Sequence, residues 1–506
     1  MNPEKKKMYA FVNPSSEWLT EHLKAYIRYH APDVVFVDRV EDIPESAPMT
    51  FQYCDGWELN ENFAVVNRTT GLINAYPNSD ALARKDHLAA VVDYWTAKRP
   101  ESILKSHVPQ AVRLTLDYAE YVDEALMAAD DLTLLSSLEE NESKEGKDRE
   151  WWILKPALVD CGAGIRLFST IEELASNLEL AEYEDDEDED NTTSEDDEDE
   201  DEEEDESQES DSIEFEKADD SFTPSLSTPG LDSLDALITT SRPTTAAVAA
   251  RTKKQKQLRA KRPQYIFKAG GRIPSAQMRA FVAQRYITAI APLEHRKWHV
   301  RAYVLSIGRL KVHVYREMLC LLAGEDYQPP WENPSLKASL TNTALQDEDV
   351  VTSRDSMRDF WSAATPDDLF SPGQNGGQDG DNWKEDIFRQ ICAISGELFR
   401  AAAHTMADKF TTLDKCFELF ALDFLIDDRG TAWLLEANET PAFYQQGVAG
   451  PISMRLMESV VCVAMEHLGL AHVGEARNSA VRKRMTEVLD ETKGLGKSNI
   501  TEIMAE

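Results

Sequence analysis

The residues with the clearest chemical potential lie in the stretch FELFALDFLIDDRGTAWLLEANETP at 417–441. Two apolar runs flank turn residues at 427–430, a pattern that predicts a β-hairpin. Because strand side chains alternate, Asp423, Glu436 and Asn438 are expected on one face of that hairpin. Carboxylate and amide oxygens are the ligands that Mg²⁺ prefers, usually together with phosphate oxygens. The stretch therefore predicts a metal site.

The predicted convergence depends on the strand register. If Asp427 pairs with Gly430, Asp423 faces Leu434 and Glu436 is a diagonal neighbour on the same face. A turn of odd length would flip one strand and separate the oxygen ligands. The alternative interpretation is a polar strand end that simply faces solvent.

A second group of chemical side chains lies on a predicted strand at 295–305. A period of two places Lys297, His299, Arg301 and Tyr303 on one face, and apolar residues alternate with them. A basic strand face can be merely solvated. Beside an acidic hairpin, this cationic face instead favours the handling of phosphate.

A third group combines a lysine with glycines. Lys155 ends a predicted strand at 152–156, and Gly162 and Gly164 follow in a short loop. Small residues let backbone N–H groups approach phosphate, and lysine supplies a point charge. The spacing matches neither a Walker A loop nor a dinucleotide-binding fingerprint. Taken alone, the loop is more simply interpreted as a β-turn.

Other patterns predict the elements that must position these groups. A strand at 8–12, a helix at 16–29 and a strand at 34–37 indicate a small α/β unit. A capping box at 169–172 predicts a helix start. Residues 101–130 are expected to be further helix or loop, 318–343 are expected to be largely irregular, and helices are expected at 80–100, 385–409, 452–470 and, in a polar tail, 477–492.

The length of 506 residues predicts two or three domains. Residues 181–206 hold 20 Asp or Glu and no Lys or Arg, and they open a low-complexity segment expected to be disordered. The expected organisation is an N-terminal α/β domain at 1–75, a central domain at 76–290 interrupted by the acidic insertion at 181–262, a C-terminal domain at 291–472 and a polar tail at 473–506.

Composition restricts the class of protein. The formal net charge of −39 gives no support for direct binding of nucleic acid. Six scattered cysteines without a CxxC pair indicate reduced thiols in the cytoplasm. No apolar run approaches the ~18–20 residues that span a membrane, and no apolar segment follows the lysines at 5–7, so neither a membrane segment nor a signal peptide is expected.

Together, the lysine strand, the glycine loop, the segment QRYI at 284–287, the Lys/His/Arg strand face, Asn342 and the acidic hairpin occur in the order of an ATP-grasp site. The chain resembles the tubulin–tyrosine ligase family over most of its folded part. The similarity is greatest to fungal ligase-like members, some of which are associated with mRNA-decapping bodies. The motifs that carry it are RKWHVRAYVL at 296–305, VYRE at 314–317, LTNTALQ at 340–346, and ALDFLID and WLLEANETP within 421–441.

The resemblance implies a fold of the α/β (α+β) class, an ATP-grasp fold with a small N-terminal α/β domain. It also implies roles by position. Asp423, Glu436 and Asn438 would hold Mg²⁺, and Arg301 and Arg316, with help from Lys85, would serve catalysis and bind the acceptor carboxylate or acyl phosphate. The implied nucleotide-binding residues are Lys155, Gly162, Gly164, Gln284, Arg285, Tyr286, Ile287, Lys297, His299 and Asn342.

The implied activity is an ATP- and Mg²⁺-dependent ligase that joins a free amino acid, tyrosine first, to a carboxylate of an acidic protein such as the tubulin C-terminal tail. ATP would convert the carboxylate into an acyl phosphate, which the amine then attacks. The sequence departs from the family at His299, where aspartate is usual. Two alternatives remain: a degenerate ligase that serves as a scaffold in a cytoplasmic mRNA-decapping assembly, and an ATP-grasp ligase with a small-molecule acceptor.

Overall fold

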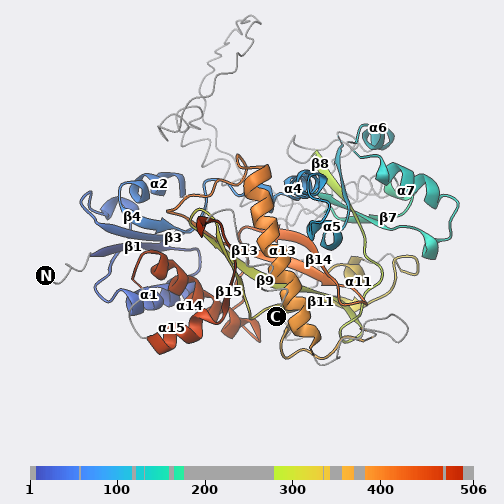
Figure 1. Cartoon of the computed structure of the whole chain (residues 1–506). Helices are drawn as coiled ribbons and strands as arrows, with labels where there is room; N and C mark the ends of the chain where they lie inside the picture. Colours follow the sequence, from blue (N-terminus) through green and yellow to red (C-terminus); the bar gives the residue numbers. More distant parts are fainter. Residues whose placement is uncertain are drawn as a thin grey trace, which may run out of the picture. The chain divides into compact units, whose positions relative to one another are not determined.

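The structure, a computed structural model, describes residues 7–493 with several internal gaps (Figure 1). The acidic insertion, Gly162 and Asn342 therefore lie outside the described residues. The gaps are 56–58, 117–120, 130, 159–163, 176–278, 334–335, 342–355, 368, 370–381 and 471–474.

A four-stranded parallel sheet with the order β2-β1-β3-β4 forms the N-terminal part. Parallel neighbours require crossover connections, and helices α1 and α2 supply two of them. Ser16 caps α1 because its hydroxyl accepts the N–H of Leu19 at 3.4 Å. The predicted strand–helix–strand pattern is confirmed. The elements are β1 (Met8–Asn13), α1 (Glu17–His30), β2 (Val35–Val37), β3 (Met49–Cys54), α2 (Leu59–Asn67) and β4 (Thr70–Ile73).

A second sheet has four antiparallel strands in the order β5-β8-β6-β7. Helices α6 and α7 contribute to the core on one face, where Trp152, Leu154 and Phe281 are buried. Lys155 and Gln284 alternate with these residues and so point to the other face. The elements are β5 (Ala111–Thr115), α6 (Val122–Met127), α7 (Thr133–Asn141), β6 (Trp152–Pro156), β7 (Arg166–Phe168) and β8 (Ala280–Arg285).

A third sheet of seven strands has β9 at its centre. One edge of β9 pairs with β13, which continues the sheet to β14, and the other edge pairs with β10 and β11. Every contact that β9 makes in this sheet is antiparallel. The strands are β9 (Arg296–Ile307), β10 (Lys311–Tyr315), β11 (Leu319–Asp326), β12 (Met357–Asp359), β13 (Phe417–Ile426), β14 (Ala432–Asn438) and β15 (Met485–Asp490).

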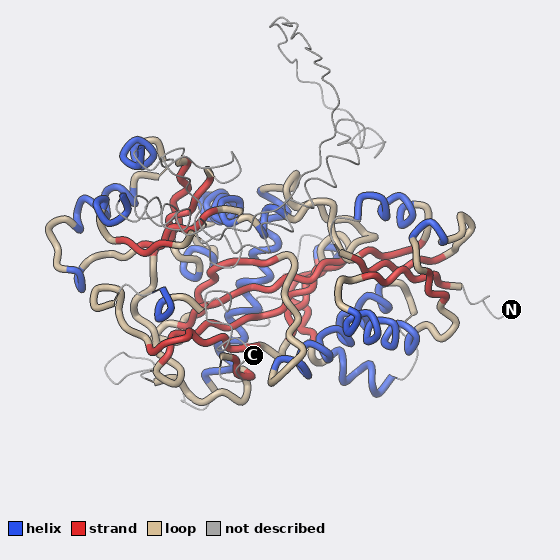
Figure 2. Tube along the Cα trace, turned by 180° about the vertical axis from the view of Figure 1, so that it is seen from behind, coloured by secondary structure: helices blue, strands red, loops and turns tan. Residues whose placement is uncertain are grey.

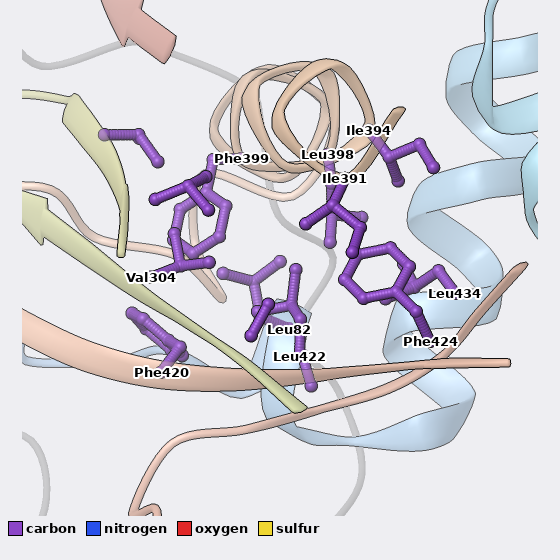
Figure 3. Packing of buried hydrophobic residues seen from close by; sticks show 14 of the residues in the cluster. Leu82, Val304, Ile391, Ile394, Leu398, Phe399, Phe420, Leu422, Phe424 and Leu434 are labelled. Carbon is purple, nitrogen blue, oxygen red and sulfur yellow. The ribbon is translucent and has the colours of Figure 1, made fainter. Parts of the chain in front are cut away.

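The two faces of the seven-stranded sheet have separate cores. Helix α13 (Trp383–Thr405) crosses one face, as Figures 1 and 2 show from opposite sides, and its Ile391 and Leu398 pack on Leu422 and Phe424 (Figure 3). Residues of α1 and α14 (Ala449–His467) belong to the core on the other face. Burying one such side chain contributes roughly 1.5–3 kcal/mol. Both faces can be covered because β9 and β13 are buried at nearly every consecutive position.

Several sequence predictions need correction. The helix predicted at 80–100 is broken at Arg84, whose extended backbone separates α3 (Asp80–Ala83) from α4 (Lys85–Ala97). The capping box uses Thr170 and Glu173 rather than Ser169 and Glu172, because the Thr170 hydroxyl accepts the Glu173 N–H. The further elements are α5 (Leu104–His107), α11 (Leu336–Ser339) and short 3₁₀ helices at Val40–Asp42, Gly146–Asp148 and Glu491–Lys493.

Three predicted segments contain strands that local pattern did not reveal. Strand β5 lies within 101–130, and β11 lies within the stretch 318–343 that was expected to be irregular. The helix predicted at 477–492 is confirmed only in its first part, because α15 (Glu475–Arg482) ends early and β15 then pairs with β10. Each of these strands pairs with a strand that is distant in the sequence or lies at the edge of its sheet. Their β conformation therefore depends on those partners more than on local sequence. None of the described helices combines the length and apolar character that a bilayer crossing requires.

Candidate functional site

A cavity between the second sheet and the seven-stranded sheet gathers most of the predicted site residues. Strands β6 and β8 supply one wall, and β9, β13 and β14 supply the other. This arrangement follows from topology, because the polar face of the small sheet and the cationic face of β9 both turn inward. The predicted residues that line it are Lys155, Gln284, Arg285, Tyr286, Ile287, Lys297, His299, Asp423 and Glu436.

Two lysines lie in this cavity with little access to solvent. The Lys155 ammonium donates to Oε1 of Gln284 at 2.7 Å, and that of Lys297 donates to the Tyr286 hydroxyl at 2.7 Å. Burial lowers the pKa of Lys155 to about 8 despite the opposing charge of Glu436, and burial lowers the pKa of Lys297 to about 7. Lysines held at this electrostatic cost in a cleft are characteristic of functional sites.

The hairpin register differs from the one predicted. Asp423 pairs directly with Glu436, whereas Phe424 pairs with Leu434. Near the turn, the pairing is shifted by one residue from the predicted register, and this shift alone would have placed Asp423 and Glu436 on opposite faces. An extra residue in β14, Leu435, then shifts the pairing by one more residue. Asp423 and Glu436 therefore still share a face.

A charged cluster surrounds Asp423. Arg301 donates to both of its carboxylate oxygens, at 2.9 and 2.8 Å, and Nε2 of His299 lies 3.5 Å from Oδ1. Burial alone would raise the pKa of Asp423, but the charge of Arg301 and then that of His299 holds it well below its usual value. Nδ1 of His299 contacts the Thr341 hydroxyl at 2.5 Å. These contacts keep Asp423 ionised.

The oxygen donors suit a hard cation. Nδ2 of Asn438 lies 3.5 Å from Oδ2 of Asp423, and the Glu436 carboxylate forms no hydrogen bond or ion pair with the described residues. The described part of the chain holds no group of three or more His, Cys, Asp or Glu arranged around a metal. A cation here would therefore draw on Asp423, Glu436, the Asn438 amide and phosphate oxygens.

Arg316 does not join this cavity. Its guanidinium pairs with Glu385 of α13 and lies 4.3 Å from the centre of a Trp361 ring. Val314, two residues earlier, belongs to the core beneath α13, so alternation directs Arg316 to the same face. Arg301 points to the opposite face, where it contacts Asp423. The two arginines predicted to bind the acceptor together are thus separated by the sheet.

The remaining predicted residues have mixed placements. Lys85 begins α4, where its N–H donates to the carbonyl of Ala157 at 3.3 Å, and its charge helps to lower the pKa of Lys155. Gly164 has a φ of 71°, a left-handed conformation that glycine adopts without strain. The Arg285 side chain pairs with Glu150 and is largely exposed. Among these residues, Lys85 influences the cavity through its charge, because that charge acts on Lys155.

Sequence reasoning missed part of the lining. Ser339, Leu340 and Thr341 close the cavity, and they directly precede the predicted Asn342. The lining also includes apolar residues, among them Ile153, which lies two residues before Lys155 on the same face of its strand. That spacing of two could have identified Ile153, but nothing local marked Ile165, Leu425 or Leu435.

The cavity measures about 70 Å³, well below the roughly 300–1,000 Å³ of pockets that enclose drug-sized ligands. The contacts of Lys155 with Gln284 and of Lys297 with Tyr286 occupy part of the space between the sheets. A nucleotide bound between the sheets would have to replace these contacts.

Comparisons with known proteins identify relatives that match most of the chain. A probable tubulin–tyrosine ligase of Schizosaccharomyces pombe is 33% identical over 448 residues, which cover 88% of each chain. The probable tubulin–tyrosine ligase PBY1 of Saccharomyces cerevisiae is 29% identical over 443 residues, 85% of this chain but only 47% of PBY1.

The fold also has a solved counterpart, described as the C-terminal domain from K. lactis Pby1, an ATP-grasp enzyme interacting with the mRNA decapping enzyme Dcp2. It matches with a TM-score of 0.55 and 22% identity, over 96% of this chain and 99% of that one, which confirms the expected ATP-grasp fold. The family model described as "Tubulin-tyrosine ligase family" matches residues 64–229 and 240–468. The chain therefore belongs to the tubulin–tyrosine ligase family.

Proposed function

We propose that the protein is an ATP-dependent ligase that joins an amino acid, tyrosine first, to a carboxylate of an acidic protein tail such as that of tubulin. The observation that carries the proposal is the single cavity that brings Lys155, Lys297, Asp423 and Glu436 together. Family membership and the names of the two fungal relatives support the same reaction class.

The proposed reaction has two steps. An acceptor carboxylate oxygen attacks the γ-phosphorus of ATP, and the bond to ADP breaks. The nitrogen of the amino acid then attacks the acyl carbon, forms the amide bond, and phosphate leaves while the amine proton passes to solvent. Charge neutralisation and positioning matter most in phosphoryl transfer.

The chain's own residues have distinct parts in that reaction. Lys155 and Lys297 would exchange their contacts with Gln284 and Tyr286 for phosphate oxygens and become fully charged. Asp423, Glu436 and Asn438 would hold Mg²⁺, which when bound neutralises charge on the β- and γ-phosphates. Arg301 keeps Asp423 ionised and oriented. Lys85 adds positive charge near Lys155.

The experiment is ATP-dependent incorporation of labelled amino acids by the full chain. Tubulin is incubated with Mg-ATP and labelled tyrosine, glycine or glutamate, and Glu436→Gln serves as the inactive control. We expect tyrosine to enter tubulin only with ATP and the unmodified enzyme. Binding of Mg-ATP without incorporation of any of the three amino acids would overturn the proposed acceptor and favour a small-molecule acceptor or a scaffold.

A second candidate function is a protein-binding role in a cytoplasmic mRNA-decapping assembly. It is favoured by the substitution at His299 and by the decapping partner of the solved Pby1 domain. Capture of decapping proteins by the full chain, equally strong for wild type and Glu436→Gln, would support this role. Loss of capture in a cell lacking the decapping enzyme would show that the enzyme is the partner.

A further inference from the structure

A hydrogen-bonded group of two buried side chains and the exposed Glu439 lies next to the candidate metal strand but outside the cavity. Oγ of Ser79, just before α3, lies 2.9 Å from Oε1 of Glu418 on β13 and 3.1 Å from Oε2 of Glu439, which follows β14. Ser79 and Glu418 are 7% and 6% exposed. Three segments far apart in the sequence thus meet at one hydroxyl.

The number of hydrogens available to Ser79 limits the protonation states of the two carboxyl groups. A serine hydroxyl has one hydrogen to donate, yet Ser79 contacts oxygens of two carboxyl groups. The second oxygen of Glu418 already accepts the backbone N–H of Tyr76 at 3.0 Å. If both carboxyls were ionised, one contact would set two oxygens with lone pairs against each other. A hydrogen on Oε1 of Glu418 resolves this, because Glu418 then donates to Ser79 and Ser79 donates to Glu439.

The surroundings of Glu418 agree with a neutral acid. Burial, with a smaller contribution from the charge of Glu439, raises the pKa of Glu418 to about 8, although the contacts with Tyr76 and Ser79 oppose this change. The Tyr76 hydroxyl donates to the carbonyl of Gly308 and contacts the hydroxyl of Ser306, both at 2.9 Å. The loop that carries Ser79 is therefore anchored to the turn after β9.

We infer that Glu418 is a neutral carboxylic acid whose proton chain through Ser79 and Glu439 positions Asn438 for the metal. Glu439 is bonded directly to Asn438, the last residue of β14, so fixing its side chain limits how β14 can rotate at its end. The same chain ties β14 to the segment that leads into α4 and Lys85. Glu418 and Ser79 are positioning residues, and this part of the inference rests on the proposed function.

The protonation state can be tested without any assumption about function. Infrared difference spectra of the full chain at pH 7, wild type minus Glu418→Gln, should contain the carbonyl stretch of one protonated carboxyl group. The band should vanish above pH 9, where Glu418 loses its proton. Absence of the band at pH 7 would overturn the neutral-acid assignment.

The positioning role can be tested by Mg²⁺ titration of ATP binding. Ser79→Ala should weaken the apparent Mg²⁺ affinity about tenfold, as loss of a group that orients a metal ligand does. Glu418→Gln should stay within about twofold of wild type, since its amide can donate to Ser79 and its carbonyl can accept from Tyr76. Ser79→Thr should restore the affinity because it returns the hydroxyl.

Ser459→Ala is the matched control, since this buried serine of α14 donates only to the Arg455 carbonyl of its own helix. Unchanged Mg²⁺ affinity in Ser79→Ala, together with weakened affinity in Asn438→Ala, would overturn the positioning role and leave the proposed function intact. If neither Asn438→Ala nor Glu436→Gln changes the Mg²⁺ dependence, the proposed metal site fails and the positioning role fails with it. The infrared result then decides the proton assignment by itself.

Discussion

The hairpin β13–β14 has a cavity near each end, and the two differ in volume and in chemistry. The cavity at the turn measures about 390 Å³ and is lined by Trp383, Trp433 and residues of the turn, whereas the one near Asp423 measures about 70 Å³. In the larger cavity, the side chains of Asp427 and Gln390 already form hydrogen bonds with their neighbours.

In the turn cavity, the carboxylate of Asp427 is bound by neighbouring N–H groups. It accepts the N–H groups of Arg429 at 3.0 Å and Thr431 at 2.7 Å and the indole N–H of Trp433 at 3.0 Å. Gln390 of α13 bridges Gly430 and Ala432. In the smaller cavity, by contrast, burial lowers the pKa of two lysines, and Glu436 has no hydrogen bond within the described chain. Electrostatic cost, and not volume, marks the candidate site.

The difference between the two cavities is tested most directly by removing the charge of one carboxylate in each of them. Glu436→Gln should lower amino-acid incorporation by at least about 100-fold, because an amide cannot supply the charge that a metal–phosphate complex needs. Asp427→Asn should leave incorporation unchanged and lower the free energy of unfolding by about 1–2 kcal/mol. Initial rates and denaturant unfolding measure the two effects. Full turnover in Glu436→Gln would refute the metal assignment.

The second largest effect is expected at Lys155. Lys155→Met should raise the Kd for ATP roughly 10- to 100-fold, because a charge-assisted contact to phosphate is lost. Lys311→Met is the matched control, since Lys311 of β10 forms an ion pair with Asp490 of the edge strand β15. Calorimetric titration with ATP measures both. Equal affinities in the two variants would show that the lysine in the smaller cavity does not meet the nucleotide.

A smaller effect should appear in the pH dependence of ATP binding. The pKa values of Lys297 and Lys155 are lowered to about 7 and about 8, so the free protein loses these two protons between about pH 6 and 9. Bound phosphate favours the ammonium form, so binding takes up protons and the affinity falls as pH rises, by at most about tenfold per pH unit for each lysine. Below about pH 6 both lysines are charged and this dependence disappears.

Calorimetry at pH 8 in two buffers of different ionisation enthalpy measures the protons taken up on binding. Lys297→Met should take up fewer protons than wild type. Proton uptake that is zero in the wild type would show that the lysines are charged before the nucleotide arrives.

The smallest effect on binding is expected from Arg316→Ala. Arg316 contacts Glu385 and Trp361 on the α13 face, so its loss should leave ATP affinity within about twofold and cost roughly 1 kcal/mol of stability. Thermal unfolding and ATP titration measure these. A tenfold loss of incorporation without a change in the unfolding midpoint would place Arg316 in the reaction after all.

Periodicity and motif order were sufficient for much of the site. The alternation in RKWHVRAYVL placed Lys297, His299 and Arg301 on one face, and the structure brings all three to Asp423 or its cavity. Long amphipathic helices such as α13 were also predictable because an apolar stripe must be buried. Strands β5, β11 and β15 were not, since their pairing partners lie far away in the chain.

The sequence by itself determined which side chains carry charge, which face of each strand they occupy and which family the chain belongs to. Only the tertiary structure decided that Leu435 is an extra residue that returns Glu436 to Asp423, and that Arg316 turns away from Arg301. It also decided that Ser79 meets Glu418 and Glu439. The physical reason is that side-chain alternation is a local property of the backbone, whereas register, sheet order and buried hydrogen bonds depend on contacts between distant segments.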